Sequence, residues 1–246
     1  MNAGMYSAVS GGILALTRLD AITNNLANAS TPGFKAERVA QRAAAVGTAP
    51  DPMAVDTPIA RVVVETDFSQ GPIEPTGNPL DVALAGKGFL VVDGPRGERL
   101  TRRGNLMIDG DGFLATKDGW RVQGENGDLR VGGVGPASSG PLAIAADGTV
   151  HAGDLTAGKL RVVTVADPSK LVREGGTVFA AGSLPLVAAA PGDVTVRQGA
   201  LEGANASPIE SLVQLIDTMR GYEAYMQAAS RLDQVSGRAV SDVGRV

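Results

Sequence analysis

Each end of the chain carries apolar residues at helical spacing, and a long stretch with a different pattern separates the two ends. In residues 3–28 the apolar positions recur at gaps of three and four, the spacing of one helix face. These positions are Met5, Val9, Ile13, Leu16, Leu19, Ile22 and Leu26. Gly4, Gly11 and Gly12 lie inside this segment and each costs roughly 1 kcal/mol relative to alanine, so we expect a helix that needs a partner surface.

The C-terminal segment, residues 207–240, repeats this pattern over a greater length. Ser207 can cap a helix, Pro208 suits the first helical position, and Glu210 can complete a capping box. The apolar positions that follow are Ile209, Leu212, Ile216, Met219, Tyr222, Met226, Ala229, Leu232 and Val235. Their spacing is close to a seven-residue repeat, which is typical of coiled-coil packing.

Between the two helical segments, from about Ile59 to Val196, short apolar runs such as "GFLVVDG" and "KLRVVTVAD" alternate with glycine turns. Asp-Gly dipeptides, a strong hairpin signal, occur at 93–94, 109–110, 111–112, 118–119 and 147–148. We therefore expect an all-β middle, either a barrel or a sandwich. Residues 36–58, rich in alanine and proline, indicate an extended or partly helical connector.

The predicted fold class is α+β: discontinuous N- and C-terminal helices that pair in a coiled-coil-like layer, and a central all-β domain. The predicted boundaries are 1–30 and 205–246 for the helical assembly domain, 31–75 and 190–204 for connectors, and 76–189 for the β-domain. The two apolar stripes are most simply buried against each other and against the same helices of neighbouring subunits.

The composition of the chain argues against several classes of function. The net charge of −4 argues against a nucleic-acid partner, which would require a basic patch. There is no cysteine, and the single histidine, His151, cannot form a multi-histidine metal site. The first basic residue is Arg18, so the N-terminus does not resemble a cleaved secretory signal, and no stretch is apolar enough to span a bilayer. We expect a soluble chain with no cofactor and no metal.

No motif predicts catalysis. Gly86-Lys87-Gly88 lacks the further glycine and the helix that a phosphate cradle requires, and a hairpin turn is the simpler reading. "DGDGFLATKDG" lacks the glutamate that completes a calcium loop. The Asn-Ala-Ser sequons at Asn28 and Asn205 lie at helix boundaries, where such residues satisfy backbone groups. A carboxylate pair stays open, although nothing in the sequence points to one.

The amide-rich end of the first helix, "ITNNLANASTPGFKA", is the most informative motif. Side-chain amides both donate and accept, so Asn24, Asn25 and Asn28 can fix the register between packed helices. Thr31, Pro32 and Gly33 then end the helix, and Phe34 can anchor the turn. A solvated polar turn followed by a loop is the alternative interpretation.

These residues resemble the bacterial flagellar rod and hook family. "NNLANASTPGFKA" is similar to the N-terminal signature of that family. "TDFSQGPIEPTGNPLDVALAGKGFLVVDG" is similar to its central β-domain, and "VRQGALEGANASPIESLVQLIDTMRGYEAYMQAASRLDQV" to its C-terminal helix and lead-in. The amino-acid sequence of these segments is most similar to that of the proximal rod members, and the distal rod is the alternative. The chain departs from the pattern at "GANASPIE" and at Gly86-Lys87-Gly88.

The resemblance implies a structural subunit and no enzyme. Such subunits leave the cytoplasm through the flagellar type III export apparatus with an uncleaved signal. They assemble in the periplasm, with copies of themselves and with homologous rod proteins, into the hollow shaft that transmits torque from motor to hook. The implied assembly residues of the helices are Val9, Ile13, Leu16, Leu19, Ile22, Asn24, Asn25, Leu26, Asn28, Ile209, Leu212, Ile216, Met219, Tyr222 and Met226, and those of the turn are Thr31, Pro32, Gly33 and Phe34. A distal rod or hook-type subunit, a transient adaptor or cap, and a wall hydrolase are the alternatives.

Overall fold

The computed structural model describes residues 3–44, 59–132, 141–190 and 192–243. The chain divides into two compact units. The first, which we call the helical unit, contains α1 (Ala3–Ala27), the strands β1 (Glu37–Ala44) and β2 (Ile59–Thr66), and α2 (Pro208–Val243). The second, the β-unit, contains residues 28–36 and the described part of 67–206.

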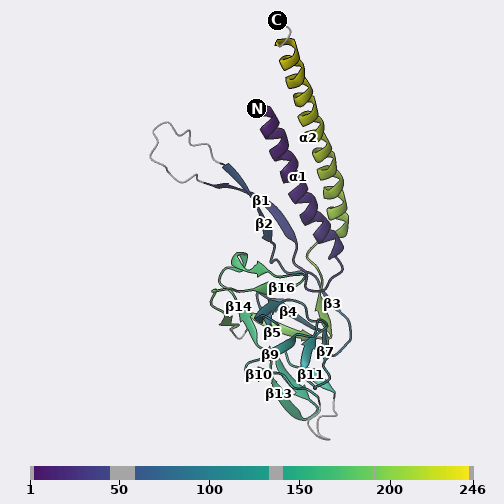
Figure 1. The fold of residues 1–246 in the computed structure, drawn as a ribbon. Helices are drawn as coiled ribbons and strands as arrows, with labels where there is room; N and C mark the ends of the chain where they lie inside the picture. Colours follow the sequence, from purple (N-terminus) through teal and green to yellow (C-terminus); the bar gives the residue numbers. More distant parts are fainter. Residues whose placement is uncertain (1–2, 45–58, 133–140, 191, 244–246) are drawn as a thin grey trace, which may run out of the picture. The chain divides into compact units, whose positions relative to one another are not determined.

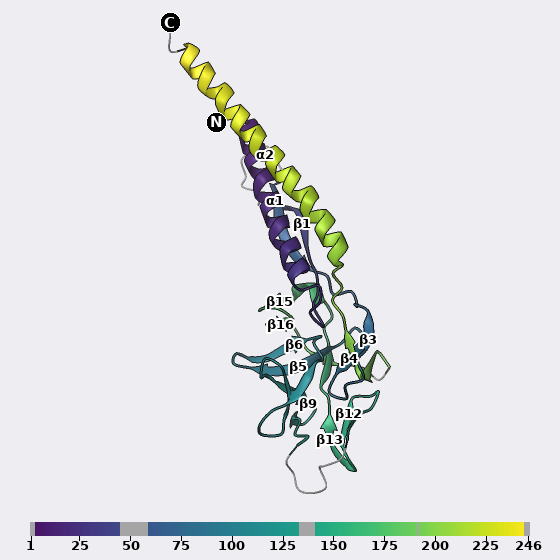
Figure 2. The same cartoon turned by 90° about the vertical axis from the view of Figure 1, so that its right-hand side faces the viewer.

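Both terminal helices form where the spacing predicts them. α1 ends at Ala27, one residue before the predicted end, and the chain then turns through hydrogen bonds from Thr31 N to Asn28 O and from Phe34 N to Thr31 O. α2 begins at Pro208. Its first turn is capped as predicted, because the Glu210 amide donates to Ser207 Oγ over 3.4 Å. Figure 1 shows the two helices lying side by side, and the view in Figure 2 agrees.

The predicted connector at residues 36–58 begins as a strand, so its extended interpretation is the correct one for the part that the structure describes. β1 pairs with β2 as a two-stranded antiparallel ribbon, with Glu37 opposite Thr66 and Ala44 opposite Ile59. Residues 45–58 lie outside the described residues. The predicted connectors 31–75 and 190–204 also contain paired strands. β3 lies in the first, and β18 and β19 lie in the second; β19 pairs with β3, and β18 pairs with β4.

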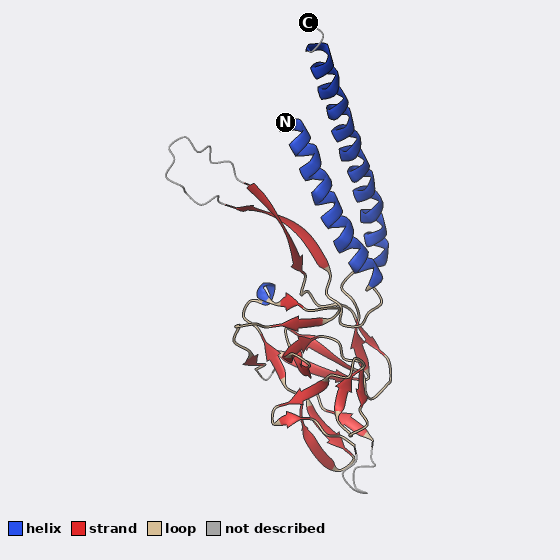
Figure 3. Ribbon diagram, viewed as in Figure 1, coloured by secondary structure: helices blue, strands red, loops and turns tan. Residues whose placement is uncertain are grey.

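The β-unit is built almost entirely of antiparallel strands, the all-β middle that the sequence predicts (Figure 3). Its main sheet has the order β15-β16-β6-β5-β9-β8-β7, with β10 on β9 and β14 on β5 and β17. Smaller sheets are β11-β12-β13, β18-β4 and β19-β3. The strands are β3 (Ile73–Pro75), β4 (Val82–Gly86), β5 (Phe89–Gly94), β6 (Gly97–Thr101), β7 (Leu106–Ile108), β8 (Leu114–Thr116), β9 (Arg121–Gly124), β10 (Gly127–Asp128), β11 (Leu142–Ile144), β12 (Thr149–Ala152), β13 (Leu155–Lys159), β14 (Val162–Thr164), β15 (Val172–Arg173), β16 (Val178–Ala180), β17 (Val187–Ala188), β18 (Val194–Gln198) and β19 (Ala200–Glu202), with a 3-10 turn at Pro168–Lys170.

Strand β5 separates two hydrophobic cores, which explains its continuous apolar run. Successive side chains of a strand point to opposite faces. Leu90 and Val92 enter one core, while Phe89 and Val91 enter the other. In the second core Phe68, Phe89 and Phe179 meet edge to face, with ring centroids 5.0 to 6.3 Å apart.

Asp-Gly pairs lie between strands as expected at 109–110, 111–112, 118–119 and 147–148. The pair at 93–94 is an exception. Asp93 and Gly94 belong to β5 and pair with Glu98 and Gly97 of β6, so Pro95 and Arg96 form this turn.

Candidate assembly interface

The helical unit pairs α1 with α2 in antiparallel orientation. A Cβ built on Gly4 would lie 3.4 Å from Leu232, one on Gly12 would lie 4.0 Å from Tyr222, and one on Gly11 would lie 2.8 Å from Cζ of Tyr225. Residue numbers rise along one helix while they fall along the other. The glycines, which lower the helix propensity of α1, therefore allow the tyrosine rings of α2 to lie directly against its backbone.

One face of each helix forms this contact. On α1 this face contains the buried positions Ala8, Gly12 and Ala15. On α2 the buried or half-buried positions recur at gaps of three, four and seven: Ser211, Leu215, Thr218, Tyr222, Ala229 and Leu232. We call these two sets the packed faces. The three α1 positions are all small, whereas α2 also contributes the large side chains of Leu215, Tyr222 and Leu232, so the packing is complementary in size.

A second apolar stripe on each helix is exposed. On α1 it contains Tyr6, Val9, Ile13 and Leu16, which are 59%, 49%, 58% and 44% exposed. On α2 it contains Ile209, Leu212, Ile216, Met219 and Met226, which are 77%, 47%, 51%, 48% and 50% exposed. Large apolar side chains gathered on one surface of a chain mark an interaction site.

The two exposed stripes lie on the same side of the helix pair. Each stripe residue from Val9 onward on α1 directly follows a packed-face position, as Leu16 follows Ala15, and on α2 Leu212 follows Ser211 and Met219 follows Thr218. One residue is a rotation of about 100° around a helix. Because the helices run antiparallel with their packed faces toward each other, the same sense of rotation turns both stripes to one side. We call the combined surface the apolar face.

The opposite side of α1 is covered by β1. Asn25 is the link, since its Nδ2 donates to the Glu37 carbonyl over 2.8 Å and its Oδ1 accepts from the Glu37 amide over 2.8 Å. The side-chain amide of Asn25 thus makes the two backbone hydrogen bonds to Glu37 that a neighbouring strand would otherwise make. Asn25 and Ile22 are buried.

The motifs considered for metal binding have other partners in the β-unit. Asp109 Oδ1 accepts from the amides of Phe113, over 2.8 Å, and Asp111, over 2.9 Å. The Phe113 amide first, and then the Asp111 amide and the Arg121 guanidinium, lower the pKa of the Asp109 carboxyl. Arg121 forms ion pairs with Asp109, Asp111 and Asp128 at 2.8 to 3.3 Å. Across the described part of the chain, no group of three or more His, Cys, Asp or Glu residues is arranged to hold a metal ion.

His151 lies in β12, where its Nδ1 is 3.3 Å from Thr156 Oγ1. None of the helices within residues 3–44, 59–132, 141–190 and 192–243 is both long and apolar enough to cross a membrane.

Known proteins match the chain along its whole length. Residues 5–35 match the family described as flagella basal body rod protein, residues 83–152 the flagellar hook protein FlgE/F/G D1 domain, and residues 197–242 the flagellar basal body rod FlgEFG protein C-terminal family. The flagellar basal-body rod protein FlgF of Salmonella typhimurium is 34% identical over 97% of each chain, and that of Caulobacter vibrioides is 30% identical over 100% of each. The chain belongs to the flagellar basal-body rod protein family.

Membership of this family confirms the resemblance drawn from the sequence, including the resemblance to the proximal rod members. The chain is a structural rod subunit and not an enzyme, as predicted. The flagellar basal-body rod protein FlgG of Bacillus subtilis is also similar, at 28% identity over 94% of this chain and 95% of its own.

The structure distributes the predicted assembly residues of this rod protein over different environments. Those on the apolar face are Val9, Ile13, Leu16, Ile209, Leu212, Ile216, Met219 and Met226; Leu19, Asn24, Leu26 and Asn28 are half-buried, and Ile22 and Asn25 are buried. Tyr222 belongs to the packed face of α2, against Gly12. The sequence pattern had merged the two stripes of α2 into one. The paired positions 211/212, 215/216 and 218/219 are the signal that separates them.

The turn residues lie in the β-unit. Gly33 has a φ of +71°, a conformation that favours glycine, and its amide donates to the Glu202 carbonyl over 2.7 Å. Phe34 is fully buried, with the Arg173 guanidinium 4.9 Å from its ring centroid. Thr31 and Pro32 are half-buried. Sequence reasoning missed Lys35 and Glu202, whose only local signal is a charge set beside apolar residues.

Proposed function

We propose that this rod subunit polymerises through its terminal helices and that the apolar face is the surface it offers to neighbouring subunits. The observation that carries the proposal is the position of the exposed stripes on one side of the helix pair. The occupants are other copies of the chain and homologous rod subunits, in keeping with membership of the rod family.

The energetics favour burial of this face. Full burial of a large apolar side chain contributes about 1.5–3 kcal/mol, and the stripe residues are about half exposed, so each has roughly 1 kcal/mol left to gain. The packed face is already occupied by α1, so α2 can contact its own α1 and a neighbouring subunit at the same time. A surface of this kind on one side of a subunit joins copies in series when the contact is head to tail.

The wider setting is part of the same proposal. The paired helices form a coiled-coil-like layer lining the hollow shaft, which lies in the periplasm and transmits torque between motor and hook. Asn24 and Asn28 set the register of that layer, whereas both polar atoms of the Asn25 side chain are bonded to Glu37 of β1. The glycine-containing α1, which needs a partner surface, suits a chain that passes through the type III export apparatus without a cleaved signal and orders on assembly.

A position in the distal rod or hook is the second candidate. The similarity to a FlgG protein and to the hook protein D1 family supports it. A transient adaptor or cap would share the helices but would be absent from isolated basal bodies.

The test is the substitution Leu212→Asp, which places a charge in the apolar face. The matched control is Ala224→Asp, an exposed position of α2 on another side of the helix. Each variant replaces the chromosomal copy, and basal bodies are purified and examined for the subunit. We expect Leu212→Asp to be missing from the rod while the Ala224→Asp subunit is incorporated. Normal rods built from the Leu212→Asp subunit would refute the assembly role of the apolar face.

A further inference from the structure

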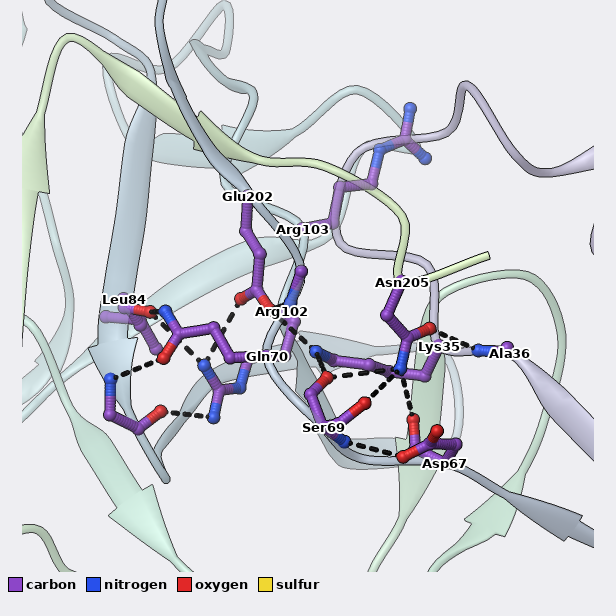
Figure 4. Close-up of polar contacts among 12 residues, drawn as sticks. Lys35, Ala36, Asp67, Ser69, Gln70, Leu84, Arg102, Arg103, Glu202 and Asn205 are labelled. Carbon is purple, nitrogen blue, oxygen red and sulfur yellow. Dashed lines mark hydrogen bonds and ion pairs between the residues drawn. The ribbon is translucent and has the colours of Figure 1, made fainter. Parts of the chain in front are cut away.

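The chain passes between the helical unit and the β-unit at residues 27/28, 36/37, 66/67 and 206/207, which makes four crossings. The β-unit residues beside these crossings are 28–36, 67–71 and 202–206. Figure 4 shows that these three segments meet around one group of polar side chains, of which Lys35, Arg102 and Glu202 are buried and Asn205 is half-buried. All of these side chains belong to the β-unit.

Glu202 is the centre of the group. Its side chain is fully buried and its Oε1 lies 2.6 Å from Lys35 Nζ, while its Oε2 lies 3.2 Å from Arg102 Nη1. The Gly71 amide donates to Oε1 over 3.0 Å. The carboxylate of Glu202 therefore joins all three crossing segments to one another and to Arg102, which directly follows β6.

Asn205 connects the same segments a second time. Its Oδ1 accepts from the Ala36 amide over 2.6 Å, and its Nδ2 donates to the Asp67 carbonyl over 2.8 Å and to the Ser69 carbonyl over 3.1 Å. Lys35 Nζ also donates to the Ser69 carbonyl, over 2.6 Å. Ala36 and Asp67 border two of the crossings, and Asn205 is the second residue before the last one. The Asp67 amide donates to the Ala36 carbonyl over 2.8 Å, so all three residues are hydrogen-bonded to one another.

Stability alone is a poor explanation for this group. Two buried cations share one carboxylate, and a buried ion pair often gives no more stability than apolar residues of the same volume. Desolvation, only partly offset by Glu202, lowers the pKa of Lys35 and of Arg102. What the group does provide is cross-linking: Lys35–Glu202 and Ala36–Asn205 join two crossing segments to each other, and Arg102 joins Glu202 to the carbonyls of Leu84 and Gly86.

We propose that Lys35, Arg102, Glu202 and Asn205 form a mechanical clamp that binds the chain crossings into one junction, so that load entering the β-unit is borne by cross-linked segments. The inference rests on the proposed function only for the source of the load, which is the torque carried by the rod. Without the clamp, each crossing segment would carry its load separately and pass it directly to the strand that follows or precedes it in the chain.

The experiment pulls on the full-length chain in an optical trap, with attachment at residues 1 and 246. Load then enters the β-unit at residues 28 and 206, the two segments that Lys35–Glu202 and Ala36–Asn205 join. The clamp variants are Glu202→Gln, which leaves both cations without their carboxylate, and Asn205→Ala, which removes the amide contacts and no charge. The control is Leu160→Ala in the core of the β-unit, where the side chain is 1% exposed.

Removal of one partner of a buried ion pair shifts an opening equilibrium by on the order of 100-fold or more. The denaturant stability of each variant is therefore measured beside its rupture force. For the same loss of denaturant stability, we expect each clamp variant to rupture at a lower force than Leu160→Ala. If Glu202→Gln does not fold, Asn205→Ala decides alone. Rupture forces that follow denaturant stability equally in clamp and core variants would overturn the clamp and leave the assembly role of the apolar face untouched.

Discussion

The substitution Asn25→Ala tests how the N-terminal amide motif is used. Asn25 makes two hydrogen bonds to Glu37, each 2.8 Å long, and is 9% exposed. Each hydrogen bond contributes about 1 kcal/mol net, and more when a buried backbone group loses its partner. We therefore expect a loss of about 2–3 kcal/mol in the local stability of the start of β1.

Hydrogen exchange measures this loss directly at the Glu37 amide. A change of about 1.4 kcal/mol is tenfold in an equilibrium, so 2–3 kcal/mol corresponds to roughly 30- to 150-fold faster exchange. Thr23→Ala, at an exposed position of the same helix, is the control and should leave the Glu37 amide protected. Wild-type exchange at Glu37 in the Asn25→Ala variant would show that Asn25 does not hold β1.

Two further predictions concern the β-unit. Gly33→Ala should lower its midpoint of denaturation, because φ is +71° and a Cβ would lie 2.5 Å from the Arg102 carbonyl carbon; replacement of Gly77, with a φ of +72° and open space around it, separates backbone strain from collision. Asp109→Ala should lower stability at neutral pH and matter less in acid. The folded pKa of Asp109 lies below the ordinary 3.8, so its contribution is present above about pH 3.8 and disappears as the pH falls through the folded pKa. Urea titrations of the wild-type and Asp109→Ala proteins from pH 7 to pH 3 measure the difference in their free energies of unfolding. A difference that grows in acid would contradict the reasoning.

Several elements could be predicted because their signals are local. The spacing in residues 3–28 and 207–240 follows from the turn of a helix, and it predicts the ends of α1 and α2 to within three residues. The Ser207 cap is likewise a local signal, because its hydroxyl accepts from an amide only three residues away. The glycine-punctuated middle predicts strands, although the turn at Pro95 and Arg96 shows that an Asp-Gly signal can lie one step from the turn itself.

The candidate site was predicted only in part. Periodicity identified apolar residues on α2 but could not divide them between α1 and solvent, since two stripes about 100° apart both recur at gaps of three and four. The division depends on which residues of α1 lie opposite. Gly11 and Gly12, which the sequence presents only as helix-weakening residues, become the surface that receives Tyr225 and Tyr222.

The family of this rod subunit, its two terminal helices and its strand-rich middle can all be read from the amino-acid sequence, because they depend on motifs and on spacings within a few residues. Which apolar stripe stays exposed and which charged side chains are buried together follows from the folded chain and not from the sequence pattern. Lys35, Arg102 and Glu202 are far apart along the chain, yet they meet because the strands that carry them pair over long range. Burial and ion pairing depend on such distant neighbours, and no local pattern records them.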